Sequence, residues 1–210
     1  MNYLDTPLLL IIAGPNGSGK STLYEGFIKN NSGYHDVIFV NPDIITRDLA
    51  RGRGYNSINE APLLEQELIN LQAARSALKL RERFLHERRS FAIETTASSP
   101  SILKLVEKAQ NIGYKVEILY VIIRTCTINM QRVHARVMRG GHAVQDADIQ
   151  RRYRRSLELL PKLIEVAKQA CIFDNTQQLT MIFKKDSNGE SFYLNEESRD
   201  FVDSLELINR

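Results

Sequence analysis

The sequence has little cysteine, no long apolar run and almost no excess of charge, and each shortage excludes a class of protein. Its two cysteines, Cys126 and Cys171, are far apart and lack CxxC spacing, so neither a disulfide framework nor a zinc site is predicted. The apolar run Leu8–Ala13 is far too short to span a membrane, and Gly14 and Pro15 end it. We therefore expect no membrane partner and a reducing, cytoplasmic location.

Glycine and proline are also scarce, with 11 and 6 residues in a chain of 210, so a collagen-like or wholly disordered chain is excluded. The apolar fraction of 43% and the charged fraction of 25% are those of an ordinary globular protein. A chain of this length buries one good core but is short for two independent domains. We therefore expect residues 1–210 to form one domain.

The charge of the chain is unevenly distributed. The formal net charge is only +3, yet residues 132–155 contain seven arginines and only two acidic residues, Asp146 and Asp148. A basic segment in a nearly neutral protein indicates an anionic ligand held at one place, rather than a whole surface built for a polyanion.

Short β-branched runs alternate with longer helical patterns, which is typical of a parallel sheet wrapped by crossover helices. A long helix is expected over residues 62–89, and another between Ser99 and Gly113. The tail predicts a hairpin over 179–194 that turns at 186–189, and a final helix near 196–208. The predicted strands are Leu8–Ala13, Val37–Val40, Phe91–Glu94, Val116–Ile123 and Ala170–Phe173, and the apolar stripe of the long helix is Leu64, Leu68, Leu71 and Leu78.

Residues 14–21 match the P-loop pattern GxxxxGK(S/T), with a predicted strand before them and a helix after them. The glycines let backbone N–H groups turn toward phosphate oxygens, and a helix beginning near Gly19 directs its positive end at them. Lys20 then reaches the β and γ phosphates of ATP or GTP, and Ser21 is placed to bind Mg²⁺. A glycine-rich turn without a ligand is the alternative. The predicted nucleotide-binding residues of the loop are Gly14, Pro15, Asn16, Gly17, Ser18, Gly19, Lys20, Ser21 and Thr22.

The stretch Gly14–Leu23 also resembles the phosphate loop of ABC transporter ATPases. The chain has no LSGGQ-like signature and no apolar strand that ends in adjacent Asp and Glu, so the parts that make those ATPases dimerise around ATP are missing. A small P-loop kinase fits the sequence better.

Two acidic residues, Asp43 and Glu94, follow predicted strands and are therefore expected at the carboxyl edge of the sheet, where α/β proteins bind ligands. In a P-loop kinase a carboxylate there can orient the acceptor hydroxyl and receive its proton. The alternative for Asp43 is the N-cap of a helix over 44–50, a role that the same residue could combine with catalysis. The alternative for Glu94 is a salt bridge to a neighbouring arginine.

Four motifs occur in the order seen in the zeta-toxin family: Gly14–Thr22, Asn41-Pro42-Asp43, Glu94-Thr95-Thr96 and the arginine-rich block. The chain resembles that family from about Leu8 to Asn175. The resemblance implies ATP-dependent phosphorylation of UDP-N-acetylglucosamine, with Asp43 as the base for the sugar 3′-hydroxyl and with Glu94 and Thr95 on the substrate. It also implies a possible antitoxin protein as a partner. The predicted fold class is therefore α/β, a nucleoside-kinase-like P-loop NTPase sandwich of three layers, with a five-stranded parallel sheet, an arginine-rich lid and a C-terminal hairpin plus helix (about 179–208).

The arginine-rich block is expected to be the lid, over about 132–155. Arg132, Arg136 and Arg139 fall on one stripe of a helix that begins after Thr125, and a guanidinium there would bind the nucleotide phosphates, with Arg136 acting on the transferring phosphoryl group. A solvated arginine face is the alternative. The toxins proper place their lid arginines differently and lack Gly140-Gly141-His142, which leaves the substrate open.

The second lid helix is expected from about residue 146. Of its four arginines, Arg152 lies nearest the apolar edge and is expected to reach the substrate. Asn175, after the fifth strand, is expected to approach the adenine, although a plain turn explains it nearly as well. Metal binding by His142 is not expected, because no partner lies at ligand spacing.

Three functions remain open from the sequence. The first is a kinase that moves the γ-phosphate of ATP or GTP to a hydroxyl of a small molecule. The second is a hydrolase in which Glu94 orients water. The third is a nucleotide-gated protein that holds nucleic acid through residues 151–155. The modest net charge and the lack of interleaved aromatic residues apart from Tyr153 argue against the third, so nucleic acid is not expected as a partner.

Overall fold

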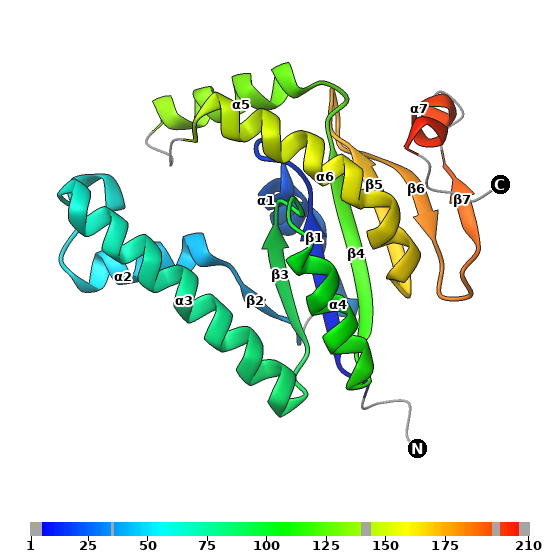
Figure 1. Ribbon diagram of the computed structural model, residues 1–210, viewed down its shortest axis with the longest axis horizontal. Helices are drawn as coiled ribbons and strands as arrows, with labels where there is room; N and C mark the ends of the chain where they lie inside the picture. The colour runs from blue at the N-terminus through cyan, green and yellow to red at the C-terminus, as the bar shows by residue number, and fades with distance from the viewer. Residues whose placement is uncertain (1–5, 35, 140–143, 195–197, 206–210) are drawn as a thin grey trace.

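The computed structural model describes residues 6–34, 36–139, 144–194 and 198–205, and its centre is a twisted sheet. The strand order is β2-β3-β1-β4-β5-β6-β7 (Figure 1). The first five strands are parallel, as predicted, and β6 and β7 are antiparallel. The strands are β1 Leu8–Ala13, β2 Ile38–Val40, β3 Phe91–Thr95, β4 Lys115–Ile122, β5 Gln169–Asp174, β6 Thr180–Lys185 and β7 Ser191–Tyr193.

Within the described residues the sheet has seven strands rather than five, because the C-terminal hairpin adds two antiparallel strands to the five parallel ones that were predicted. The C-terminal hairpin forms as predicted and turns at Asp186, whose carboxylate accepts the N–H groups of Asn188 and Glu190. Its first strand pairs with the open edge of β5, so the hairpin extends the sheet rather than packing beside it. An unpaired edge of backbone N–H and C=O groups favours such an addition.

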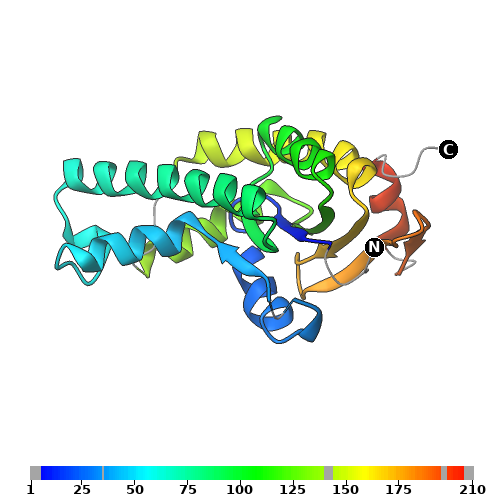
Figure 2. The same ribbon diagram turned by 90° about the horizontal axis from the view of Figure 1, so that it is seen from below.

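Helices cover the two faces of the sheet unequally. One face is covered by α4 (Ser101–Asn111), α6 (Asp146–Val166) and the C-terminal half of α3 (Leu63–Glu87). The other face is covered by α1 (Lys20–Leu23) and the π-helical turn η2 (Tyr24–Ile28), with the short 3₁₀ turn η3 (Ser32–Tyr34) beyond it. Figure 2 shows these helices above and below the strands.

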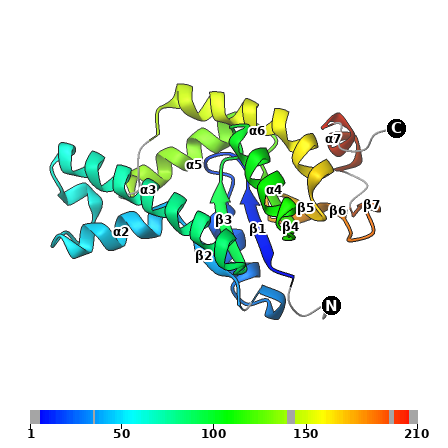
Figure 3. The same cartoon turned by 60° about the horizontal axis from the view of Figure 1, so that its bottom comes forward.

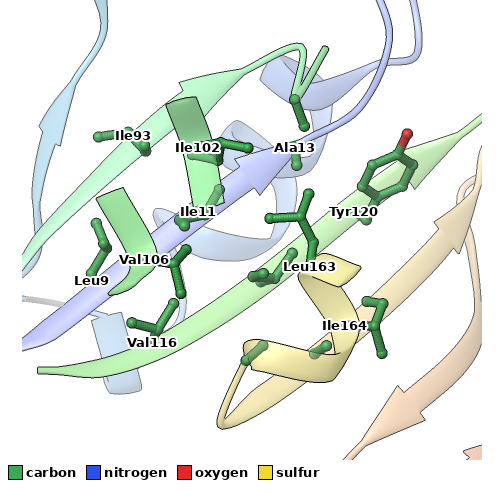
Figure 4. Packing of buried hydrophobic residues seen from close by; sticks show 14 of the residues in the cluster. Leu9, Ile11, Ala13, Ile93, Ile102, Val106, Val116, Tyr120, Leu163 and Ile164 are labelled. Atoms are coloured by element: carbon green, nitrogen blue, oxygen red, sulfur yellow. The ribbon is translucent and has the colours of Figure 1, made fainter. Parts of the chain in front are cut away.

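The two cores follow from the alternation of side chains along each strand. Leu9, Ile11 and Ala13 of β1 point to one face, and Leu10 and Ile12 point to the other. All five are fully buried, which is why β1 reads as one continuous apolar run. In Figure 4 the odd-numbered side chains of β1 meet those of the covering helices, including Ile102, Val106, Leu163 and Ile164.

The long helix α3 and the shorter α2 (Pro42–Gly52) lie side by side and form an arm beyond the β2 edge of the sheet, with the 3₁₀ turn η4 (Ile58–Glu60) between them in the chain (Figure 3). The predicted leucine stripe of α3 does not form its packed face. Leu64, Leu68, Leu71 and Leu78 are between 49% and 70% exposed. The buried residues lie on another face of the helix and are Ile69, Ala73, Ala77, Phe84 and Leu85.

At the carboxyl ends of the parallel strands lie α5 (Cys126–Met138) and the start of α6 (Figure 1). The second lid helix begins at Asp146, as predicted, whereas the expected flexible break at 140–142 lies outside the described residues. The final helix α7 is Arg199–Ser204, and the rest of the range expected for it, apart from Ser198 and Leu205, is also outside them. Among the described residues, no helix combines the length and apolar character that a membrane span requires.

Candidate active site

The P-loop connects β1 to α1 in a backbone conformation that its glycines make possible. Gly17 and Gly19 have φ angles of 76° and 99°, in the left-handed region that other residues avoid. Gly17 also leaves no room for a side chain, since a Cβ there would lie 2.6 Å from the carbonyl oxygen of Asn129. Gly19 is the N-cap of α1, so the helix begins at Lys20, as the motif predicts. The side chain of Lys20 is almost fully buried and donates to the carbonyl of Pro15 at 2.9 Å.

Two asparagine side chains hold this loop from outside. Asn129 of α5 is fully buried and donates its amide to the carbonyl of Asn16 at 2.7 Å. Asn175, after β5, donates to the carbonyl of Ser18 at 2.8 Å. Asn175 therefore braces the P-loop and is not among the residues that line the cavity described next, while its approach to the adenine stays a prediction. No sequence signal marks Asn129, because a buried asparagine on a helix follows no fixed spacing from a P-loop.

A cavity of about 570 Å³ opens beside the P-loop at the carboxyl edge of the sheet. It brings together predicted residues from five separate places in the chain: Lys20, Asp43, Glu94 with Thr95, Arg136 and Arg152. Arg132 and Arg139 are not among the residues that line it. The remaining lining residues are Asn16, Gly17, Asn41, Pro42, Thr96, Val144, Gln145 and Asp148.

Glu94 lies between the phosphate loop and α2. Its carboxylate is 3.9 Å from the ammonium of Lys20, accepts the amide of Asn41 at 3.1 Å, and lies 3.5 Å from the hydroxyl of Ser21. Burial raises the pKa of Glu94, against the opposing effect of Lys20, and burial likewise lowers the pKa of Lys20. The alternative interpretation of Glu94 was a salt bridge to an arginine, and the basic side chain that it pairs with here is Lys20. Its position is therefore directly beside the phosphate site.

Asp43 lies in the first turn of α2 with its side chain exposed at the cavity. Its alternative role as the N-cap is wrong: the cap is Asn41, whose side-chain oxygen accepts the N–H of Asp43 at 2.8 Å. Pro42 occupies the first helical position, where its missing N–H costs nothing, and this places the cap two residues before Asp43. The sequence Asn-Pro was the available signal for that cap. The carboxylate of Asp43 is consequently left for the cavity.

The lid arginines divide between different surroundings. Arg136 lines the cavity and interacts electrostatically with Lys20 and Glu94. Arg132 instead donates to the carbonyl of Thr176 at 3.3 Å, and Arg139 is exposed at the end of α5. Arg152 reaches the cavity from α6. Of the three arginines predicted to form one stripe, only Arg136 lines this cavity, while Arg132 of α5 contacts the loop after β5, and phosphate binding by any of them stays a prediction.

The two lid helices contact each other close to the cavity. His134 of α5 and Asp146, the first residue of α6, form a hydrogen bond of 2.6 Å. On α6, Arg151 pairs with Asp148 at 2.8 Å, and Tyr153 donates to the carbonyl of Ile123 at 2.8 Å. The start of α6 is therefore fixed to α5 and to the end of β4, and Arg152 is held at the cavity.

The loop after β3 is unusually constrained. Ala97 is buried with a φ of 48°, a conformation that is uncommon for any residue other than glycine. The hydroxyl of Thr95 accepts the N–H of Ala97 at 3.0 Å, and the carbonyl of Thr96 accepts the hydroxyl of Ser156 at 2.6 Å. Such strain is maintained by the surrounding contacts, and here it sets the position of Thr95 and Thr96 in the cavity wall.

The oxygen atoms beside the P-loop fit a magnesium ion. Mg²⁺ is commonly held by one or two protein oxygens together with nucleotide phosphates and water. The hydroxyl of Ser21 and the carboxylate of Glu94 supply such oxygens within 3.5 Å of each other. In the part of the chain that the structure describes, no group of three or more His, Cys, Asp or Glu residues could hold a metal alone. The site therefore suits an ion that arrives with a nucleotide.

Comparison with solved structures identifies proteins of the same fold. The AvrRxo1-ORF1:AvrRxo1-ORF2 complex with sulphate ions is similar with a TM-score of 0.68 and 14% identity, over 98% of this chain and 66% of that one. The PezAT chromosomal toxin-antitoxin system of Streptococcus pneumoniae gives a TM-score of 0.59 and 14% identity, over 96% of this chain and 85% of that one. A putative kinase from Chloroflexus aurantiacus gives 0.52 and 16%, over 72% and 78%. The α/β P-loop fold class is therefore confirmed.

Sequence comparison identifies the family of the chain in addition to its fold. An uncharacterized protein of Haemophilus influenzae is 30% identical over 146 residues, which are 69% of this chain and 91% of that protein. The model of the family described as Zeta toxin matches residues 2–198, which is nearly the whole chain. The chain belongs to the zeta toxin family.

Proposed function

We propose that the protein is a P-loop kinase that transfers the γ-phosphate of ATP to a hydroxyl group of a small molecule. The observation that carries the proposal is the single cavity that joins Lys20 of the phosphate loop to the carboxylates of Asp43 and Glu94 and the guanidinium groups of Arg136 and Arg152. A hydrolase needs the phosphate loop and a carboxylate to orient water. A kinase also needs space and a base for an acceptor, and the volume of this cavity and the carboxylate of Asp43 at its wall support that choice.

On the donor side, the backbone N–H groups of the P-loop and the ammonium of Lys20 would bind the β and γ phosphates. Ser21 and Glu94 would hold Mg²⁺, which neutralises negative charge on the phosphates when it is bound. Arg136 would stabilise the charge that develops on the transferring phosphoryl group, since it lines the same cavity as Lys20. These groups orient the phosphate and do not form bonds to it.

On the acceptor side, Asp43 would accept the proton of the attacking hydroxyl. Its carboxylate stands at the cavity wall and is free of the capping role, which belongs to Asn41. Arg152 and Thr95 would bind the remainder of the acceptor. Family membership makes a nucleotide sugar such as UDP-N-acetylglucosamine the first candidate acceptor.

A partner protein belongs to the same proposal. The PezAT relative is a toxin-antitoxin system, and we infer that this chain also has an antitoxin that restrains it. A protein that covered the cavity would separate ATP from its acceptor.

Incubation of the purified protein with ATP, Mg²⁺ and a panel of nucleotide sugars, sugars and nucleosides tests the proposal. We expect a phosphorylated product from at least one acceptor, together with ADP in equal amount. Release of inorganic phosphate at the same rate with and without every acceptor would instead identify a hydrolase and would contradict the proposal.

A further inference from the structure

Helix α3 leaves a row of leucines uncovered on the outside of the molecule. Leu64, Leu68, Leu71 and Leu78 are between 49% and 70% exposed, and Leu63 beside them is 80% exposed. These are five of the eleven large apolar side chains that are exposed in the part of the chain that the structure describes. Figure 2 shows α2 against one side of α3 in the arm, with the opposite side facing outward. Apolar side chains that gather on a surface mark an interaction site, and none of the functions described above uses this one.

The spacing of the row is that of a coiled-coil seam. Its four leucines from Leu64 to Leu78 follow one another at intervals of four, three and seven residues, which keep them on the a and d positions of one heptad register. The seam runs for about 27 Å at 1.5 Å per residue. Helix α3 therefore has one face packed against its own chain and a second face with the pattern that packs against another helix. The six seam positions, all of them exposed, are Leu64, Leu68, Leu71, Arg75, Leu78 and Glu82.

The charged residues beside the seam are divided between the two halves of α3. No basic residue occurs in 63–72, and no acidic residue occurs in 73–81. Two such helices attract each other when they run antiparallel, because the acidic half of each then faces the basic half of the other. A parallel pair would place Arg75 opposite its own copy, and like charges across an interface are costly. Helix α3 is thus complementary to a second, reversed copy of itself. The charged residues are Glu65 and Glu67 in the first half and Arg75, Lys79 and Arg81 in the second.

We propose that two copies of this chain form a homodimer in which their α3 helices pair antiparallel along this seam. The two-fold axis lies level with Ala73, so residues equally far from Ala73 in the two copies meet. Leu68 then packs on Leu78 of the second copy, and Leu71 packs beside Arg75 of the second copy. A single polar residue in such a seam fixes the register, and Arg75 has that role here. The dimer is independent of the proposed transfer reaction.

The pairing also supplies a counter-charge that Arg81 lacks in its own chain. The side chain of Arg81 is half-buried, and its Nε atom is buried with no hydrogen-bond partner among the described residues. Burial lowers the pKa of this guanidinium, and a buried cation without a counter-charge is costly. Arg81 and Leu78 line a groove of about 320 Å³ between α3 and α4. Glu67 and Arg81 flank the same side of the seam, so Glu67 of the second copy approaches Arg81 while Leu68 of the second copy covers the groove at Leu78.

Sedimentation equilibrium of the full-length protein, without nucleotide or acceptor, tests the dimer directly. The concentration would run from about 1 μM to about 1 mM, which covers weak and moderate association. We expect the average mass to rise from that of one chain toward that of two. A mass of one chain at every concentration would overturn the inference. Because no transfer is measured, failure of the kinase proposal would leave this result unchanged.

One substitution in the seam and one outside it show whether the leucine row is the interface. Leu71→Lys should weaken association at least tenfold, because the introduced ammonium lies opposite Arg75 of the second copy. Leu71 is 49% exposed in the single chain, so the variant should remain folded. Leu63→Lys is the matched control, since Leu63 is on the same helix, is 80% exposed and lies outside the heptad series. It should change association by no more than about twofold. Equal weakening by the two variants would exclude the proposed seam.

A second substitution tests the direction of the helices. Adding Arg75→Glu to Leu71→Lys should restore association, because each introduced ammonium then faces an introduced carboxylate of the second copy. A parallel pair would set each introduced group against its own copy and would gain nothing. A double variant as weak as Leu71→Lys alone would therefore overturn the antiparallel arrangement. A wild type that stays monomeric and binds a different protein through Leu71 would assign the seam to that protein and would also overturn the inference.

Discussion

The two sides of the active-site cavity are built in opposite ways. On the donor side, Lys20 and Ser18 are buried, and the loop backbone is held at the carbonyls of Asn16 and Ser18 by side chains from two distant parts of the chain. On the acceptor side, Asp43 of α2 is exposed and Arg152 of α6 is only half-buried. The difference teaches that the phosphate site is formed before any ligand arrives, whereas the acceptor side is completed by groups that still have room to adjust.

The largest effect is expected from a substitution that changes the acceptor side alone. Asp43→Asn should lower kcat by about 10²- to 10⁴-fold, which is the usual contribution of a positioned base, and should leave ATP affinity unchanged. Steady-state transfer and ATP titration measure the two quantities. Asp48→Asn is the control, since Asp48 is exposed on the same helix and pairs with its neighbour Arg47 at 3.5 Å. Full transfer activity in Asp43→Asn would show that another group takes the proton.

The next largest effect is expected from a substitution on the donor side. Lys20→Ala should lower transfer by about 10²- to 10³-fold, since it removes a preorganised charge from the phosphates. Because the same ammonium contacts the phosphates before the reaction, ATP affinity should fall as well, which distinguishes this variant from Asp43→Asn. Lys29→Ala, at an exposed lysine paired with Glu25, provides a control that should bind ATP normally.

A pH profile sharpens the comparison at Glu94, which contacts both sides. Burial raises the pKa of Glu94 above its ordinary value of 4.5, so its carboxylate gains a proton at a higher pH than a solvated one. Transfer that needs the ionised form should therefore fall as the pH decreases through this raised pKa. Glu94→Gln should lose that acid limb and should lower the rate about 10- to 100-fold, in line with the loss of a hydrogen bond to a charged group. An unchanged acid limb in Glu94→Gln would assign it to a different group.

The smallest effect tests how rigid the donor side is. Gly17→Ala should destabilise the protein by about 1–3 kcal/mol, because its Cβ would collide with the backbone of α5 and its φ is positive. Gly26→Ala is the matched control, since it lies in the helical turn η2 with open space around it, and it should be neutral or slightly stabilising. Urea denaturation of both variants measures the difference. Equal stability of the two would mean that the P-loop can move away from α5.

The sequence predicts the donor side better than the acceptor side, and the reason is physical. The P-loop is a local motif whose glycines, lysine and serine act within a few residues of each other, and strand ends place Asp43 and Glu94 at the same edge. Asn129 and Arg81 leave no such trace. The groups around each of them come from elements far away in the chain. The local sequence therefore does not reveal whether such an asparagine or arginine on a helix is solvated or buried.

Helix α3 illustrates the same limit in the fold. Its leucines at helical spacing predicted the packed face, yet a different set of residues, which includes Ile69, Ala73 and Phe84, is buried. Periodicity identifies the helix and its length but not which of two stripes meets a neighbour. The C-terminal hairpin shows the same limit in the sheet. Its turn can be predicted from local sequence, whereas its pairing with β5 depends on which edge of the sheet is left open.

The hydrogen bond from Asn129 to the P-loop fixes one turn of α5 to that loop, so a tilt of the helix about this turn moves its C-terminal end. Arg136 follows Asn129 by seven residues, or about 10 Å along the axis at 1.5 Å per residue. A tilt of about 10° around the pinned turn would carry the guanidinium end by about 2 Å, which is enough to make or break its contact with a phosphate oxygen. Small displacements of the phosphate loop on nucleotide loading would thus be amplified at the arginine, without any rearrangement of the sheet.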